Sequence, residues 1–279
     1  MAQDYIEVRL KTTVDPGELL GFLNQEEISG AWENDGVVYL YWPVDHWTAE
    51  ILNAIEEALR RLGDQTATTL GVDRIHDQNW NEVWAQSIQP VRVGRRMLIR
   101  QSWNWQPRRT GEIELVIDPK RAFGSGHHAT TQLLMEWLED RIQGNERVLD
   151  IGTGSGILGM IALRLGAVSA LGIDHDPIAI ECARECAAIN GFGPELDLRT
   201  AAIGELSARA FDLVLANLDL NTLLAHADRV VRCARPGGTI LISGIAPQDY
   251  QEISTAYAAA GGLVVSRRDR DEWMALEIR

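Results

Sequence analysis

The stretch Val148-Leu149-Asp150-Ile151-Gly152-Thr153-Gly154-Ser155-Gly156 joins a short apolar run to three alternating glycines. The apolar segment 157–163 follows it directly, and a second apolar run ends at Asp174. A strand, a glycine turn, a helix and a second strand ending in an acid form half of a doubly wound nucleotide-binding sheet. Glycine lets the backbone pass close to a ligand because it has no Cβ. The pattern therefore predicts a site for an adenosine-containing cofactor, with the Asp174 carboxylate accepting hydrogen bonds from the ribose hydroxyls.

Strands and helices alternate along the chain from residue 147. The predicted strands are 147–151, 170–174, 197–200, 211–216, 239–244, 263–268 and 273–278, and the predicted helices lie near 157–165, 177–190, 220–233 and 248–260. Only 269–272 separate the last two strands, which is too short for a crossover, so these strands must pair antiparallel. We therefore predict an α/β fold, a seven-stranded doubly wound sheet with an antiparallel last strand.

The first 72 residues carry a different pattern, β-α-β-β-α-β, which is typical of a small ferredoxin-like α+β domain. Its predicted elements are a strand at 5–10, a helix after Asp15-Pro16, a hairpin turning at Asn34-Asp35-Gly36, a helix at 48–62 and a strand at 66–72. A connecting helix should follow. We divide the chain into a domain at 1–72, a linker helix at 73–90 and a larger domain at 91–279.

The composition limits the partners. The net charge is −14, and residues 1–72 carry 13 acidic and only 4 basic side chains. Naked nucleic acid is therefore not an expected partner, although arginines interleaved with Trp103 and Trp105 leave an RNA-binding interpretation open. The acidity suits either a basic protein ligand or simple solubility. Without a membrane span or a secretion signal, and with three cysteines read as buried free thiols, we expect a cytoplasmic protein.

Two cofactors compete for the glycine turn. Residues 154–159 satisfy Gly-x-Gly-x-x-Gly with Asp174 twenty residues beyond Gly154, which suits the pyrophosphate of NAD. S-adenosylmethionine has no phosphate, and its sulfonium and amino-acid tail favour an acid near the first strand. Asp150 supplies that acid, and the closing hairpin is typical of a methyltransferase sheet. The pattern favours S-adenosylmethionine, with a dehydrogenase as the alternative.

Several further motifs resemble one family. They are Ile117-Asp118-Pro119, the segment 122–131 (AFGSGHHATT), the segment 211–218 (FDLVLANL) and Ser243-Gly244-Ile245, with Trp80, Trp84 and Trp103 upstream. Over residues 77–250 the chain is similar to the bacterial ribosomal protein L11 methyltransferases, the PrmA family. It departs from the family pattern at Ser125, His127, Ala129, Asp219 and Asn221.

This resemblance implies a class I methyltransferase fold with an N-terminal substrate-recognition domain. It implies S-adenosylmethionine-dependent N-methylation of lysine and N-terminal amines of the ribosomal protein L11. Contacts to the cofactor are implied for Thr131, Gly152, Asp174 and Asn217. We expect a monomer whose partner is this ribosomal protein. A methyltransferase for another protein or a small molecule, or a non-catalytic cofactor-binding scaffold, are the alternatives.

The residues suggest roles beside the resemblance. Gly154 and Asp150 belong to the cofactor turn, and Phe123 rims a glycine-rich loop that we expect to fold over the cofactor. The Asn217 side-chain oxygen and the Leu218 carbonyl are candidate acceptors for the attacking amine. His128 would orient the loop or assist the departure of a proton. No metal site is expected, because His127 and His128 have no further ligand near them in the sequence.

Overall fold

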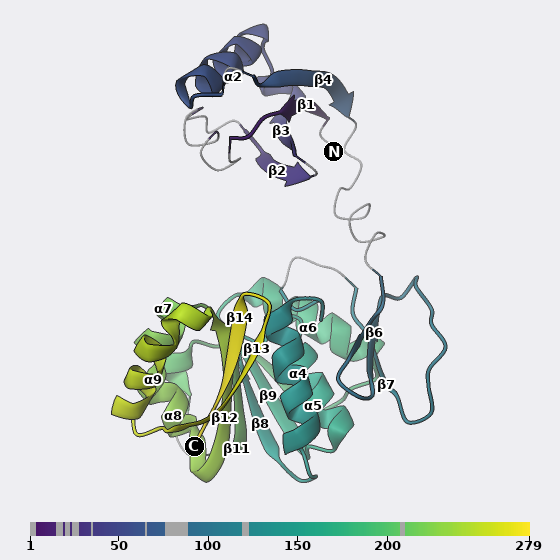
Figure 1. Ribbon diagram of the computed structural model, residues 1–279. Coiled ribbons are helices and arrows are strands. Elements are labelled where there is room, and N and C mark those ends of the chain that lie inside the picture. The colour runs from purple at the N-terminus through teal and green to yellow at the C-terminus, as the bar shows by residue number, and fades with distance from the viewer. Residues whose placement is uncertain are drawn as a thin grey trace. The chain divides into compact units, whose positions relative to one another are not determined.

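The computed structural model describes residues 4–14, 19, 23, 28–34, 36–64, 66–75, 89–118, 123–206 and 210–279. The chain divides into two compact units, residues 1–84 and 85–279 (Figure 1). The linker helix predicted at 73–90, with Trp80 and Trp84, lies mostly outside the described residues. Each unit is therefore described by itself.

The smaller unit holds a four-stranded antiparallel sheet in the order β2-β3-β1-β4. Its elements are β1 (Tyr5–Lys11), β2 (Gly30–Asn34), β3 (Val37–Pro43), the short 3-10 helix η1 (Val44–His46), α2 (Ala49–Arg61) and β4 (Thr68–Ile75). This is the strand order of a ferredoxin-like domain. β4 runs past the boundary predicted at residue 72, because its pairing with β1 continues to Tyr5 opposite Ile75.

Apolar side chains at helical spacing bury one face of α2. Ile51, Ile55 and Leu59 are at most 6% exposed and pack with the sheet. The first helix, predicted after Asp15-Pro16, lies mostly outside the described residues, but Leu19 and Leu23 are buried in the same cluster. The unit therefore has a hydrophobic core of its own.

The larger unit begins with a three-stranded sheet that the sequence analysis did not predict. It consists of β5 (Val91–Val93), β6 (Met97–Arg100) and β7 (Ile113–Val116), in that order. Two arginines of the arginine-rich segment form ion pairs in and beside this sheet: Arg92 pairs with Glu112 and Arg100 with Glu114. These arginines serve the fold, which weakens the RNA-binding interpretation.

The seven-stranded sheet has the order β10-β9-β8-β11-β12-β14-β13. Its strands are β8 (Arg147–Ile151), β9 (Ser169–Asp174), β10 (Leu196–Thr200), β11 (Phe211–Asn217), β12 (Ala234–Ile245), β13 (Val264–Arg270) and β14 (Trp273–Ile278). The pairs of β8 with β9 and of β11 with β8 and β12 are parallel, whereas β14 is antiparallel to both of its neighbours. The predicted sheet and its antiparallel closing hairpin are confirmed.

Helices cover both faces of this sheet (Figure 1). One layer holds α4 (Ala129–Arg141), α5 (Ile157–Leu165) and α6 (Pro177–Ile189); the other holds α7 (Leu220–Ala225), α8 (Ala227–Cys233) and α9 (Tyr250–Ala259), with 3-10 turns η2 (Ile203–Glu205) and η3 (Pro247–Asp249) between elements. The single helix predicted at 220–233 is wrong. His226 leaves the helical region, at φ −118 and ψ 14, and separates α7 from α8.

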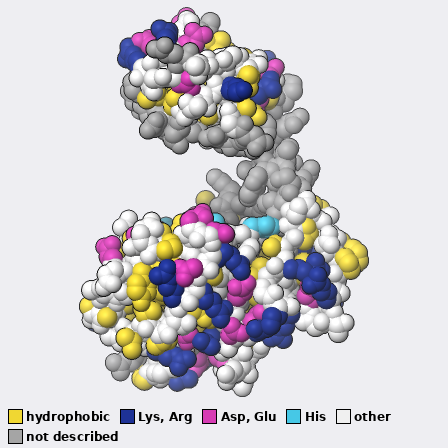
Figure 2. Space-filling model, in the orientation of Figure 1, with side chains coloured by type: hydrophobic (Ala, Val, Ile, Leu, Met, Phe, Trp, Pro, Cys, Tyr) yellow, Lys and Arg dark blue, Asp and Glu magenta, His cyan; other side chains and the backbone are white. Residues whose placement is uncertain are grey.

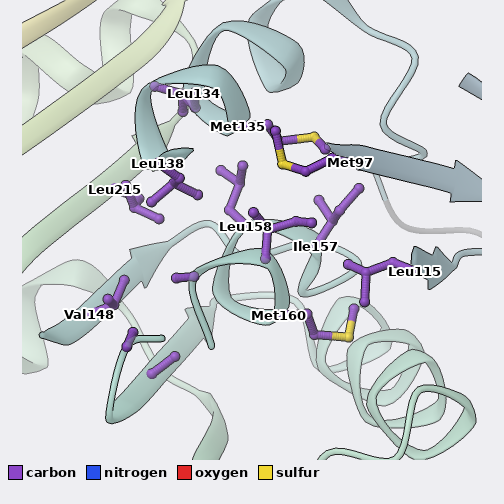
Figure 3. Close-up of a cluster of buried hydrophobic side chains, with 14 of the residues drawn as sticks. Met97, Leu115, Leu134, Met135, Leu138, Val148, Ile157, Leu158, Met160 and Leu215 are labelled. Carbon is purple, nitrogen blue, oxygen red and sulfur yellow. The ribbon is translucent and has the colours of Figure 1, made fainter. Parts of the chain in front are cut away.

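Strand alternation divides the interior into two cores. On β8, Val148 joins the core beneath α4 and α5, while Leu149 and Ile151 join the core beneath α8 and α9. Figure 3 shows the first core, in which side chains of α4 and α5 meet Val148 and Leu215 of the sheet and Met97 and Leu115 of the small sheet. Asp150 follows the same alternation as Val148, so its carboxyl group is directed toward α5.

The three cysteines, Cys182, Cys186 and Cys233, are buried and free, as predicted. None of the helices described is long and apolar enough to cross a bilayer.

Candidate functional site

The site lies where the chain order of the strands reverses, between β8 and β11, which is where ligands bind in open α/β sheets. The glycine turn leaves the carboxyl end of β8 with left-handed residues Gly152 (φ +69) and Gly154 (φ +54). A Cβ on Gly152 would lie 2.3 Å from Cδ2 of Leu218, and one on Gly154 would lie 2.4 Å from the Phe123 carbonyl oxygen. Only glycine lets the turn pack between the end of β11 and the loop that contains Phe123.

A buried carboxylate holds this turn from below. Asp150 is 1% exposed, and its Oδ2 accepts hydrogen bonds from the Thr153 hydroxyl (2.6 Å) and from the backbone N–H of Gly159 in α5 (3.3 Å). Burial is the main reason that the pKa of Asp150 rises to about 6, and the nearby charge of Asp174 raises it further. Asp150 was expected to touch the cofactor. Its position instead suits a residue that shapes the turn.

Asp174 ends β9 beside the glycine turn. Its Oδ2 accepts the backbone N–H of Gly154 at 3.1 Å, and its Oδ1 accepts that of Asp176 at 3.1 Å. The side chain is 11% exposed, and each oxygen accepts a single backbone N–H among the described residues. A carboxylate oxygen has two lone pairs, so Oδ2 can accept a further hydrogen bond from a ligand hydroxyl, whereas Oδ1 also lies 3.4 Å from Nδ1 of His175.

Asn217 ends β11, and its side chain reaches α4. The Nδ2 group of Asn217 donates a hydrogen bond to the hydroxyl of Thr131, at 3.2 Å, and Thr131 is 2% exposed. This bond orients the amide, because the nitrogen faces Thr131 and the oxygen faces away from it. Two residues that lie 86 positions apart in the sequence are thus brought together at the carboxyl end of β11.

The loop 123–128 borders the same edge of the sheet. Its Phe123 carbonyl accepts the N–H of Ser155 at 2.9 Å, and the Ser155 hydroxyl donates to the Gly124 carbonyl at 2.7 Å. Phe123 is 58% exposed and lies edge-on against His128, with 5.4 Å between the ring centroids. The His128 ring also contacts the ring of Trp273, with 5.2 Å between the centroids.

His128 also begins α4. Its Nδ1 lies 2.7 Å from the Thr130 hydroxyl, and the backbone N–H of Thr130 donates to the same atom at 3.4 Å. The ring is therefore oriented by the helix start and by two aromatic neighbours. His127 lies apart from it, with Nε2 bonded to the Gln89 carbonyl at 2.7 Å. Among the described residues no cluster of three metal-ligating side chains occurs.

The Leu218 carbonyl lies against Gly244 of β12, which follows Ser243, the residue paired with Asn217. A Cβ on Gly244 would lie only 2.1 Å from the Leu218 oxygen, so this position of the carbonyl requires glycine at residue 244. Asp219, one of the positions that depart from the family pattern, caps α7 by accepting the Thr222 N–H at 3.0 Å and the Thr222 hydroxyl at 2.6 Å.

The site therefore contains residues that the sequence analysis missed. Ser155 belongs to the glycine motif that the sequence analysis quoted. Its hydroxyl could have indicated a hydrogen bond from this turn to another loop, which in the structure is the bond to the Gly124 carbonyl. Gly244 was quoted only as part of a motif. Trp273 had no local signal, because it reaches His128 only through the fold of the last hairpin.

Comparison with known proteins places the chain beside one group. The family model described as "Ribosomal protein L11 methyltransferase (PrmA)" matches residues 15–279. A ribosomal protein L11 methyltransferase of Symbiobacterium thermophilum is 37% identical over 202 residues, which cover 72% of this chain and 66% of that protein. One from Ralstonia nicotianae is 33% identical over 264 residues, covering 95% of this chain and 85% of that protein.

A solved structure gives the same result. The crystal structure of a ribosomal protein L11 methylase from Lactobacillus delbrueckii subsp. bulgaricus superposes with a TM-score of 0.64 at 29% identity. The superposition covers 69% of this chain and 98% of that chain. Sequence and fold therefore agree on the same set of relatives.

The substitution Gly154→Ala should destabilise the larger unit beyond the cost of a left-handed alanine, about 1–2 kcal/mol, because the new Cβ meets the Phe123 carbonyl. Gly191→Ala is the matched control, since Gly191 has φ +70 and a Cβ there meets nothing within 4 Å. Urea denaturation of both variants measures the difference. Equal losses would contradict the close approach of turn and loop.

Asp150→Asn should change how stability depends on pH. Because the pKa of Asp150 rises to about 6 in the fold, the folded state retains a proton that the unfolded state loses near pH 4. This group's contribution is fully present below about pH 4 and is lost as pH rises through 6, by about 3 kcal/mol. The stability of Asp150→Asn relative to the parent should therefore rise by that amount between pH 4 and 7 in urea denaturation. A pH-independent difference would refute the raised pKa.

Proposed function

The chain belongs to the ribosomal protein L11 methyltransferase family, and from that membership we propose that it transfers methyl groups from S-adenosylmethionine to amines of the ribosomal protein L11. The observation that carries the proposal beyond family membership is the convergence of Gly152, Asp174 and Asn217 at the switch point of the sheet. We further propose that the acceptors are lysine side chains and the N-terminal amine, that the chain works as a cytoplasmic monomer, and that the acidic domain 1–72 binds the basic substrate.

The residues at the switch point fit an adenosyl ligand. Gly152 and Gly154 let the turn lie directly against Leu218 and the Phe123 carbonyl at the edge of the site, and Asp174 keeps a lone pair on Oδ2 for a ribose hydroxyl. Between the two cofactors that the glycine turn allows, family membership favours S-adenosylmethionine over NAD. Asp150 would act beneath the turn, and Phe123 would cover the ligand from the loop.

When bound, S-adenosylmethionine supplies a methyl carbon that the positive charge on sulfur has already activated for attack. The protein's task is then to present a neutral amine in line with that carbon. A lysine amine has a pKa of about 10.4 in water, so it must lose a proton before it can attack.

Two oxygens at the end of β11 suit that task. The Thr131 hydroxyl is bonded to the amide nitrogen of Asn217, which leaves its Oδ1 to accept from another group, and Gly244 has no Cβ to displace the Leu218 carbonyl. Each oxygen can accept one N–H of the amine, so that the lone pair is directed to the methyl carbon. The ring of His128, held between Phe123 and Trp273, would line the approach of the substrate side chain and could take up the departing proton.

The proposal predicts methylation of L11 itself. The purified chain, incubated with S-adenosylmethionine and L11 from cells that lack this modification, should add mass in steps of one methyl group, with peptide mapping locating them on amines. A basic ribosomal protein other than L11 serves as the substrate control. An unchanged mass of L11, while the chain still binds S-adenosylhomocysteine in calorimetry, would refute the proposed substrate.

Asn217→Ala should lower kcat by about 100-fold, because it removes one of the two oxygens that orient the amine. The KM for S-adenosylmethionine should change less if the amide acts mainly on the acceptor. Thr131→Val should lower kcat to a smaller extent, since it only releases the amide from its orientation. Asn221→Ala, an exposed asparagine in α7, is the control. Steady-state methylation of L11 measures all three, and full activity of Asn217→Ala would remove Asn217 from the mechanism.

A further inference from the structure

The hairpin of β13 and β14 contacts a row of polar side chains on α4. Gln132, Glu136 and Asp140 are spaced four residues apart, so they line one face of α4. Arg268 and Arg270 of β13 meet this row, with Arg268 bonded to Asp140 at 2.6 Å. In Figure 2 basic and acidic side chains alternate over the part of the larger unit where Figure 1 shows β13 beside α4.

Arg270 divides its guanidinium between two partners one helical turn apart. Its Nη1 donates to Oε1 of Gln132 at 2.6 Å, and its Nη2 donates to Oε1 of Glu136 at 2.8 Å. About two thirds of the Arg270 side chain is buried, with 31% exposed. Two partners hold the planar group in one orientation, so the arginine fixes the amide oxygen of Gln132.

Gln132 carries this constraint to the loop. Its Nε2 donates to the backbone carbonyls of Gly126 (3.2 Å) and His127 (3.0 Å). A guanidinium can only donate and a carbonyl can only accept, so the amide has one orientation that satisfies all of these partners. The amide therefore bridges β13 to the glycine-rich loop 123–128.

The second half of this loop needs an anchor of its own, because the Ser155 bonds hold only Phe123 and Gly124. Gly124 and Gly126 both have positive φ, and Phe123 at its start is largely exposed. The same hairpin reaches the loop a second time through Trp273, which contacts the His128 ring. Arg270 and Trp273 thus hold the two ends of the short segment 126–128.

We propose that Arg270 and Gln132 form a clamp that positions the loop 123–128 over the methyl-transfer site. The role in transfer rests on the proposed function, whereas the clamp itself is a property of the unliganded chain. Both are positioning residues, because they act through the backbone of Gly126 and His127. Opening the clamp frees the backbone at 126–127, between the Ser155 anchor and the start of α4, without altering Gly152, Asp174 or Asn217.

Gln132→Glu tests the clamp at its loop side. The carboxylate keeps its bond to Arg270 but has no N–H for the two carbonyls, which it repels. We expect hydrogen–deuterium exchange in the unliganded peptide 123–129 to rise about tenfold, and the KM for S-adenosylmethionine to rise by about the same factor, with little change in Tm. Gln132→Met, which lacks both charge and donor, should act in the same direction and replaces the first variant if that one does not fold.

Arg270→Gln tests the hairpin side, and Arg268→Gln is its matched control. Arg270→Gln removes the bonds of Arg270 to Gln132 and Glu136, and Arg268→Gln removes the bond of Arg268 to Asp140, so both should lower Tm. Of these two arginines, only Arg270 touches Gln132. Faster exchange of 123–129 is expected for Arg270→Gln alone. The clamp is overturned if Gln132→Glu and Gln132→Met leave the exchange at the parent's rate, or if Arg268→Gln raises it as much as Arg270→Gln does. Should the parent transfer no methyl group, the proposed function fails, while the exchange rates still decide whether the clamp exists.

Discussion

A buried carboxylate beneath a left-handed turn is the constraint on which the site depends. Asp150 binds the Thr153 hydroxyl and the first turn of α5 at once, so the end of β8 and the start of the helix cannot move apart. Burying this acid raises its pKa, and the protein accepts that cost where an apolar residue would leave the Thr153 hydroxyl and the Gly159 N–H without this acceptor. The glycine turn also orients Asp174, whose Oδ2 accepts the N–H of Gly154, and it packs against the Leu218 side chain at Gly152. Residues at the ends of β9 and β11 are thus positioned through a turn that one buried group holds in place.

Most of the larger unit could be predicted from its sequence, because its signals are local. Apolar runs of strand length, the Asp176-Pro177 helix start and the Asn190-Gly191 stop occur in the chain where the structure has them. The short connection at 269–272 alone forced the antiparallel hairpin. The three-stranded sheet was missed because its strands are only three or four residues long and lie among arginines. Such strands carry too few alternations to be recognised.

The candidate site could be predicted in part, for the same physical reason. Gly152, Asp174 and Asn217 follow strand ends, and the carboxyl ends of parallel strands meet at one edge whatever the details of packing. The roles of Asp219 and Asp150 were harder to assign, because a carboxylate can face a ligand, cap a helix or fasten a turn. The sequence does not say which backbone N–H groups lie nearest. Arg270 and Trp273 depend wholly on tertiary packing, since more than 130 residues separate each of them from its partners.

The position of β14 bears on how the molecule is made. Although β14 follows β13 in the chain, it lies between β12 and β13 in the sheet, and every residue from Met274 to Ile278 is buried. During synthesis on the ribosome, β13 therefore emerges with no strand to pair with, and β12 keeps an open apolar edge until β14 is released. The sheet therefore cannot be built strand by strand in chain order, because β12 and β13 are joined only through β14, which follows both of them.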